Sequence, residues 1–168
     1  MSKTTQFKFI IKNKEEFEKD LKSKGIEFGE QSTHSYTYFK IPESLNLNAT
    51  LRTKESKGQI STDMKVKRNE SGEYDHFESS IEDSDQLMQI YSNLGCKPIV
   101  TFHKSRRTFQ NDLIRLDFDS VDELGIFLEV KFSMDKLEEV QKFLENLGLD
   151  INKADKRSNI DIYLEKNN

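Results

Sequence analysis

The 168-residue sequence predicts an α+β fold built on a largely antiparallel sheet. Three observations support this class. Six segments alternate apolar and polar residues with a period of two, as half-buried strands do. Three other segments carry apolar residues at helical spacing and end at a glycine. The connections are short, and no repeat or Pro/Gly/Ser linker interrupts them, so residues 1–168 are expected to form a single domain.

Each predicted helix has local signals of its own. The helix expected over 14–24 follows Asn13, and Glu16 three residues later completes a capping box. The helices expected over 84–94 and 134–147 each present one apolar face, and a glycine follows each of them. Because these signals are independent of one another, they predict three separate helices between the strands.

The predicted strands cover 4–11, 49–54, 60–67, 74–81, 113–119 and 126–132. One face of each is mainly apolar, whereas lysine and arginine recur on the other face together with a few carboxylates. For a single strand, a solvated face explains such a pattern. Across several strands, a closed or strongly curved sheet with a charged interior is the better explanation. Such an interior needs a polyanionic ligand, metal ions or water.

The composition excludes several classes of protein. The 26 Lys and Arg face 30 Asp and Glu, and a formal net charge of −4 argues against a nucleic-acid polymer as partner. The single cysteine, Cys96, rules out a disulfide framework and a cysteine-ligated zinc site. No apolar run approaches the ~20 residues of a membrane span, and the N-terminus lacks a signal-peptide core. We therefore expect a cytoplasmic protein with no membrane partner.

Several motifs together resemble the signature of the CYTH superfamily. Lys104-Ser-Arg-Arg107 precedes the most specific run, Asp119-x-Val-x-x-Leu-Gly-x-Phe-x-Glu129. Arg52-x-Lys54 resembles the family's Arg-x-Arg, and Lys65 or Lys67 its following lysine. The superfamily comprises class IV adenylyl cyclases, thiamine triphosphatases and inorganic triphosphatases. The resemblance implies a triphosphate tunnel, an antiparallel barrel of about eight strands, closed or nearly closed, with helices packed outside.

The resemblance also implies a site for phosphate. A triphosphate carries about four negative charges and needs several Arg and Lys donors, and wall carboxylates hold Mg²⁺ or Mn²⁺. For Lys65, Lys67 and Arg115, a plain surface position is an equal alternative. The expected phosphate-binding residues are Lys8, Arg52, Lys54, Lys65, Lys67, Lys104, Arg106, Arg115 and Lys131. The expected metal-binding residues are Glu78, Asp117, Asp119 and Glu129.

The sequence departs from the family pattern at its carboxylates. The first-strand Glu-x-Glu-x-Lys reads Thr4-Thr-Gln-Phe-Lys8, and the middle Glu-x-Glu reads Glu78-x-Ser80. The closing Glu-x-Glu reads Glu129-Val-Lys131, where a cation replaces a carboxylate. Losing metal ligands lowers the affinity for Mg²⁺, and a lysine at the same place repels a divalent ion. The expected interior is therefore basic and poor at metal catalysis.

These features predict binding of a nucleotide or another phosphate-rich small molecule, for sensing or sequestration, without efficient metal-dependent turnover. Mg²⁺ or Mn²⁺ is expected to bind weakly at most. The alternative is an active metal-dependent triphosphatase or class IV-type adenylyl cyclase, with one metal held by Asp119 and Glu129 and with Glu78 or Asp117 completing the site. Residues 158–163 resemble the C-terminal segment of the cyclase-like branch, which favours a nucleotide. A third possibility is a partner-binding protein with a vestigial tunnel. Relatives are often dimers, so a homodimer is also compatible.

Overall fold

The computed structural model describes residues 4–68 and 74–167. Within these residues it contains eight strands, four α-helices and three short 3₁₀ turns. In chain order they are β1 (Thr4–Ile10), α1 (Lys14–Ser23), β2 (Ser32–Lys40), η1 (Glu43–Leu45), β3 (Ala49–Ser56), β4 (Gln59–Lys67), β5 (Tyr74–Ile81), α2 (Ser84–Asn93), β6 (Lys97–Gln110), β7 (Arg115–Val121), β8 (Gly125–Ser133), η2 (Met134–Lys136), α3 (Leu137–Asn146), η3 (Ile151–Lys153) and α4 (Asn159–Asn167).

The eight strands belong to one sheet in the order β1-β8-β7-β6-β2-β3-β4-β5. The β1–β8, β7–β8, β2–β3, β3–β4 and β4–β5 ladders are antiparallel. The predicted α+β class and the strand number are confirmed. β2, β6 and α4 lie outside the segments that periodicity predicts. The helix expected over 134–147 begins as the 3₁₀ turn η2 and continues as α3.

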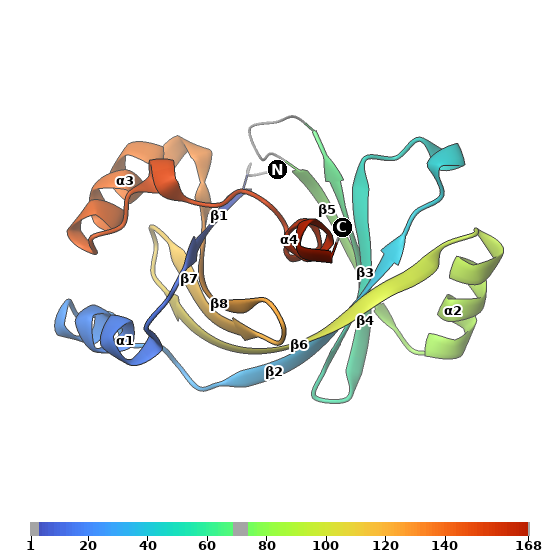
Figure 1. The fold of residues 1–168 in the computed structure, drawn as a ribbon, viewed down its shortest axis with the longest axis horizontal. Helices are drawn as coiled ribbons and strands as arrows, with labels where there is room; N and C mark the ends of the chain where they lie inside the picture. Colours follow the sequence, from blue (N-terminus) through green and yellow to red (C-terminus); the bar gives the residue numbers. More distant parts are fainter. Residues whose placement is uncertain (1–3, 69–73, 168) are drawn as a thin grey trace. The chain divides into compact units, whose positions relative to one another are not determined.

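The chain forms two compact units. The first unit comprises residues 1–32 and 105–168, and the second comprises residues 33–104. In the first unit, β1, β7 and β8 bury their apolar faces against α1 and α3, which lie on the same side of these strands (Figure 1). The fully buried side chains of this core include Leu21, Leu116, Leu128, Val140 and Leu144. The opposite face of these strands is thereby left to polar residues.

Local signals explain where α1 begins and ends. The side chain of Asn13 accepts a hydrogen bond from the backbone N–H of Glu16 at 3.3 Å, as expected for a helix cap. Gly25 follows the helix with a φ of +82°, a left-handed conformation that glycine adopts without a steric cost. The predicted start and end of this helix are therefore confirmed to within one residue.

In the second unit, α2 packs on the apolar side of the sheet. Phe39, Tyr91 and Cys96 form a small buried cluster there, with Leu51 beside it. The β3–β4 hairpin turns through Lys57 and Gly58, whose φ values are +52° and +75°. Two consecutive left-handed residues are typical of a two-residue type I′ turn, which fixes the register of both strands. None of the helices in residues 4–68 and 74–167 is both long and apolar enough to cross a membrane.

Candidate functional site

In the first unit, most of the residues expected to bind phosphate or metal lie on the polar face of the strands. Antiparallel register places Lys8 opposite Glu129, Asp117 opposite Glu129, and Arg115 opposite Lys131. Directly opposed residues share one face of a sheet, so these side chains all lie opposite the apolar core. The face assignment made from alternation is confirmed. The side chain of Thr4, at the start of β1, lies outside the described residues.

Arg106, in the part of β6 that belongs to the first unit, binds three carboxylates. Its Nε and Nη2 atoms donate to Asp119 at 2.6 Å each. Nη2 also donates to Glu129 Oε2 at 2.9 Å, and Nη1 lies 2.9 Å from Asp117 Oδ2. Burial alone would lower the pKa of Arg106, but Asp119, Glu129 and Asp117 outweigh it and raise that pKa. The guanidinium is therefore permanently charged, and each of its three nitrogens contacts a carboxylate oxygen.

Asp117 is the most buried member of this group, with no exposed surface. It accepts hydrogen bonds from Lys131 Nζ and Arg115 Nε at 2.9 Å each, and from Thr108 Oγ1 at 2.7 Å. Burial alone would raise the pKa of Asp117, but Lys131 and Arg106 outweigh it and hold that pKa below its usual range. Asp117 is thus ionised at neutral pH. We call Arg106, Arg115, Asp117, Asp119, Glu129 and Lys131 the ion cluster.

The oxygen atoms of the ion cluster are the type that Mg²⁺ and Mn²⁺ prefer. In this arrangement, however, Arg106 takes both oxygens of Asp119 and one of Glu129. Among residues 4–68 and 74–167, no group of three or more His, Cys, Asp or Glu side chains is arranged to hold a metal ion. The fourth expected ligand, Glu78, belongs to the second unit. The residues as placed here therefore do not fit a metal ion.

Lys8 is tied to the C-terminal segment. Its backbone N–H and C=O bond to Asp155 at 2.8 and 2.7 Å, and its Nζ donates to the carbonyl of Arg157 at 2.8 Å. The residue is only 4% exposed. The segment after α3 thus pairs with the edge of β1 and positions a cation on the polar face. Nothing in the local sequence around residue 155 indicated this role.

The polar face of the second unit is richer in cations. Register places Arg52 opposite Asp63, Asp63 opposite Glu78, and Lys65 opposite His76, and Lys54 and Lys67 share this face. On β3, β4 and β5 the face therefore carries four Lys or Arg side chains and two carboxylates. Because the negative charges are fewer, this face retains a net positive charge and suits an anionic ligand.

Arg52 is held by one carboxylate and by aromatic rings. Its Nε lies 2.8 and 2.9 Å from the two oxygens of Asp63, and its Nη1 donates to Tyr38 Oη at 3.2 Å. Its guanidinium carbon lies 4.6 Å from the ring centre of Tyr36, and Lys104 Nζ lies 4.7 Å from the same ring. Lys104 is only 6% exposed. The buried ring of Tyr36 thereby orients two of the expected phosphate-binding cations through cation–π contacts.

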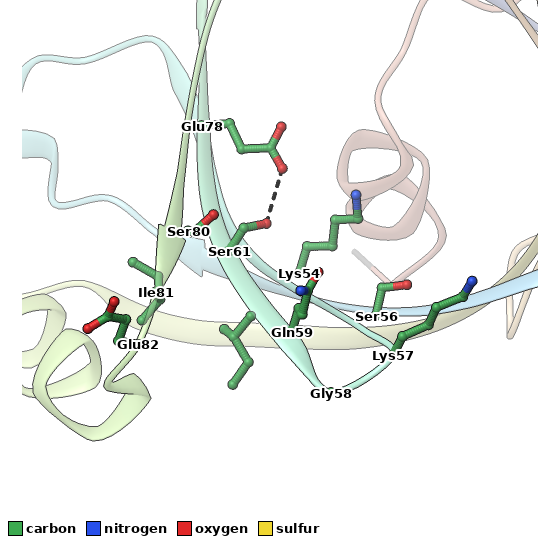
Figure 2. A pocket seen from close by; sticks show the side chains of 11 residues that line it. Lys54, Ser56, Lys57, Gly58, Gln59, Ser61, Glu78, Ser80, Ile81 and Glu82 are labelled. Atoms are coloured by element: carbon green, nitrogen blue, oxygen red, sulfur yellow. Dashed lines mark hydrogen bonds between the residues drawn. The ribbon is translucent and has the colours of Figure 1, made fainter.

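A polar cavity of about 560 Å³ lies at the β3–β4 hairpin and the end of β5 (Figure 2). Its charged lining residues are Lys54, Lys57, Glu78 and Glu82, together with three serine side chains. Ser61 Oγ donates to Glu78 Oε1 at 3.1 Å. Lys54 makes no hydrogen bond or ion pair with any residue that the structure describes. A lysine that lines a cavity without a carboxylate partner can bind an incoming anion at little cost.

His76 lies beside these charges and is about two-fifths exposed. Its Nε2 is 3.8 Å from Asp63 Oδ1, and Lys65 occupies the opposite position on β4. Partial burial and the positive charge of Lys65 lower the pKa of His76 below its ordinary value, although Asp63 opposes them. The imidazole is therefore neutral at pH 7 and adds no charge to the face.

Asp63, Tyr38 and Thr108 contact the expected cations or carboxylates but were not among the predicted site residues. A signal for Asp63 is present in the sequence. A two-residue turn at Lys57 and Gly58 places Arg52 opposite Asp63, because both lie five residues outside the turn. No comparable signal exists for Thr108, whose contact with Asp117 depends on the neighbouring position of β6 and β7.

Arginines, lysines and ionised carboxylates on the polar face of a sheet are typical of proteins that bind phosphate-rich ligands. The particular family follows from a family model. The model of the CYTH domain matches residues 2–158, and the chain belongs to this family.

Three known proteins show the range of similarity. A Methanocaldococcus jannaschii protein, whose name proposes adenylate cyclase activity, is 27% identical over 146 residues, which are 84% of this chain and 83% of that protein. A conserved hypothetical protein from Pyrococcus furiosus has a similar structure, with a TM-score of 0.79 at 21% identity over 95% of this chain and 99% of that chain. A Hippeastrum protein described as an adenylyl cyclase candidate with a dominant triphosphatase activity matches at a TM-score of 0.65 and 11% identity, over 99% and 96% of the two chains. These similarities confirm the predicted fold class.

Proposed function

We propose that the chain binds a nucleotide or another phosphate-rich small molecule, for sensing or sequestration, without efficient metal-dependent turnover. The observation that carries the proposal is the excess of cations on the polar face of β3, β4 and β5. Asp63 is bound by Arg52 and Glu78 by Ser61. Glu78 and Glu82 line the cavity beside Lys54 and Lys57, but Lys54 makes no ion pair with any residue that the structure describes. A phosphate group supplies the negative charge that the face as a whole lacks.

Titration calorimetry with ATP and inorganic triphosphate tests this function directly. We expect binding in EDTA, with a Kd that changes by less than about threefold when Mg²⁺ is added. Lys54→Ala should weaken binding about tenfold, because it removes one charge-assisted hydrogen bond. The matched control is Lys22→Ala on the exposed side of α1, which should leave the Kd unchanged. If neither ligand nor any other nucleotide binds in EDTA, the proposal is wrong.

The second candidate function is a metal-dependent triphosphatase or adenylyl cyclase. The names given to the M. jannaschii and Hippeastrum proteins favour it. Release of phosphate or cyclic nucleotide from triphosphates, measured with Mg²⁺ or Mn²⁺, distinguishes it from binding alone. Turnover that is lost in Asp119→Asn or Glu129→Gln, with folding verified by circular dichroism, would replace the binding function by the enzymatic one.

A further inference from the structure

We infer that Lys131 is a built-in cation of the ion cluster, whose ammonium group neutralises its carboxylates and closes it to Mg²⁺ and Mn²⁺. Lys131 Nζ lies 2.9 Å from Asp117 Oδ2 and 3.8 Å from Glu129 Oε1. These carboxylates come from neighbouring strands and lie directly opposite each other in the β7–β8 ladder. The ammonium group thus contacts two of the three carboxylates that a divalent ion would need.

Arg106 competes with a metal ion for the carboxylate oxygens as well. Arg106 Nη1 lies 2.9 Å from the same Asp117 oxygen that Lys131 contacts, and Arg106 takes both oxygens of Asp119. A divalent ion binds carboxylate oxygens at about 2.0–2.6 Å and would have to displace these donors. Displacement would leave the buried Arg106 or the partly buried Lys131 without its partner, which is costly.

The charges of the ion cluster lead to the same conclusion. Arg106, Arg115 and Lys131 balance Asp117, Asp119 and Glu129, so these six side chains have no net charge. Lys8, opposite Glu129 on β1, adds a positive charge to the same face. A divalent ion would give the cluster itself a charge of +2, around a carboxylate that is fully buried. Replacing Lys131 by glutamate changes the charge of the cluster to −2, which one divalent ion balances.

The test measures Mn²⁺ binding to the full-length chain by electron paramagnetic resonance, with no nucleotide present. We expect Lys131→Glu to bind one Mn²⁺ per chain at least about tenfold more tightly than the natural protein. Adding Asp119→Asn to this variant should reverse the gain. The matched control is Lys142→Glu on the exposed surface of α3, which changes the total charge by the same amount and should bind Mn²⁺ no better than the natural protein.

Either of two results would overturn the inference. In one, the natural protein binds Mn²⁺ as tightly as Lys131→Glu; in the other, Lys142→Glu gains as much affinity as Lys131→Glu. If circular dichroism shows that Lys131→Glu is unfolded, Lys131→Gln decides, since it removes the ammonium group without adding charge. Tighter Mn²⁺ binding by Lys131→Gln than by the natural protein supports the built-in cation, and equal binding contradicts it. Because no phosphate ligand is involved, this result is independent of the proposed function.

Discussion

The two units hold their buried arginines in different ways. Arg106 in the first unit contacts three carboxylates, and its side chain is 10% exposed. Arg52 in the second unit contacts one carboxylate, a tyrosine hydroxyl and the face of an aromatic ring. In the first arrangement, all three guanidinium nitrogens contact a carboxylate oxygen. The second leaves one face of the sheet with more cations than carboxylates.

Because of this difference, we expect the ion cluster of the first unit to stabilise the fold and the polar face of the second unit to bind the ligand. The ion cluster links β6, β7 and β8 through bidentate and shared hydrogen bonds of Arg106. It has no net charge to offer a ligand. The polar face of β3, β4 and β5 carries four cations against two carboxylates, so a phosphate ligand is expected to gain more there. Substitutions that act differently in the two units test this division.

The largest effect is expected for Arg106→Met. The substitution leaves three carboxylates in a buried region with too few cations, and the free energy of unfolding should fall by about 3–5 kcal/mol. Urea unfolding followed by circular dichroism measures this loss. Arg115→Met is the matched control, because its side chain contacts the same Asp117 but is 41% exposed.

We expect Arg115→Met to lower the free energy of unfolding by less than about 1 kcal/mol, since solvent screens a half-exposed ion pair. Equal losses in the two variants would show that the number of carboxylates around Arg106 does not set its contribution. The stabilising role that we assign to the ion cluster would then be wrong.

A smaller effect is expected for Asp63→Asn in the second unit. Arg52 keeps the Tyr38 hydroxyl and the Tyr36 ring, so the free energy of unfolding should fall by only about 2 kcal/mol. The face also loses a negative charge, and the affinity for inorganic triphosphate should rise about threefold. Calorimetry and urea unfolding measure both quantities. Glu78→Gln, an exposed position on the same face, is the control for stability and should lose less than about 1 kcal/mol.

The faces of the strands could be predicted from the sequence because burial imposes a strict period of two. Phe7, Leu116 and Leu128 lie in the core, and Lys8, Asp117 and Glu129 lie on the opposite face, as alternation indicates. The helix ends could be predicted as well, because caps and glycines act within a few residues.

Features that depend on contacts distant in the sequence could not be predicted in this way. β2 alternates Tyr36 and Tyr38 with polar residues, but it also buries the adjacent Phe39, and most of its other residues are polar, so the alternation is weak. In α4, Ile160, Ile162 and Leu164 alternate as in a strand, yet the segment is helical because tertiary packing buries the two isoleucines. The three carboxylates around Arg106 depend on the order β6-β7-β8, which local patterns do not contain.

The smallest effect concerns pH and again distinguishes the two units. His76 has a pKa below its ordinary value in the folded chain, owing to partial burial and to Lys65, so the unfolded chain binds the proton more readily. The stability that neutral His76 contributes is present above about pH 6.5 and is lost as the pH falls through the pKa of the folded state.

His76→Gln should therefore lose less stability than the natural protein between pH 7.5 and 5, by under about 1 kcal/mol because the ring is partly exposed. Asp117 in the first unit keeps its charge over this range, since its pKa is lowered. Thermal unfolding of both proteins across this pH range measures the difference, and identical pH profiles would show that His76 does not respond to the cations of the second unit.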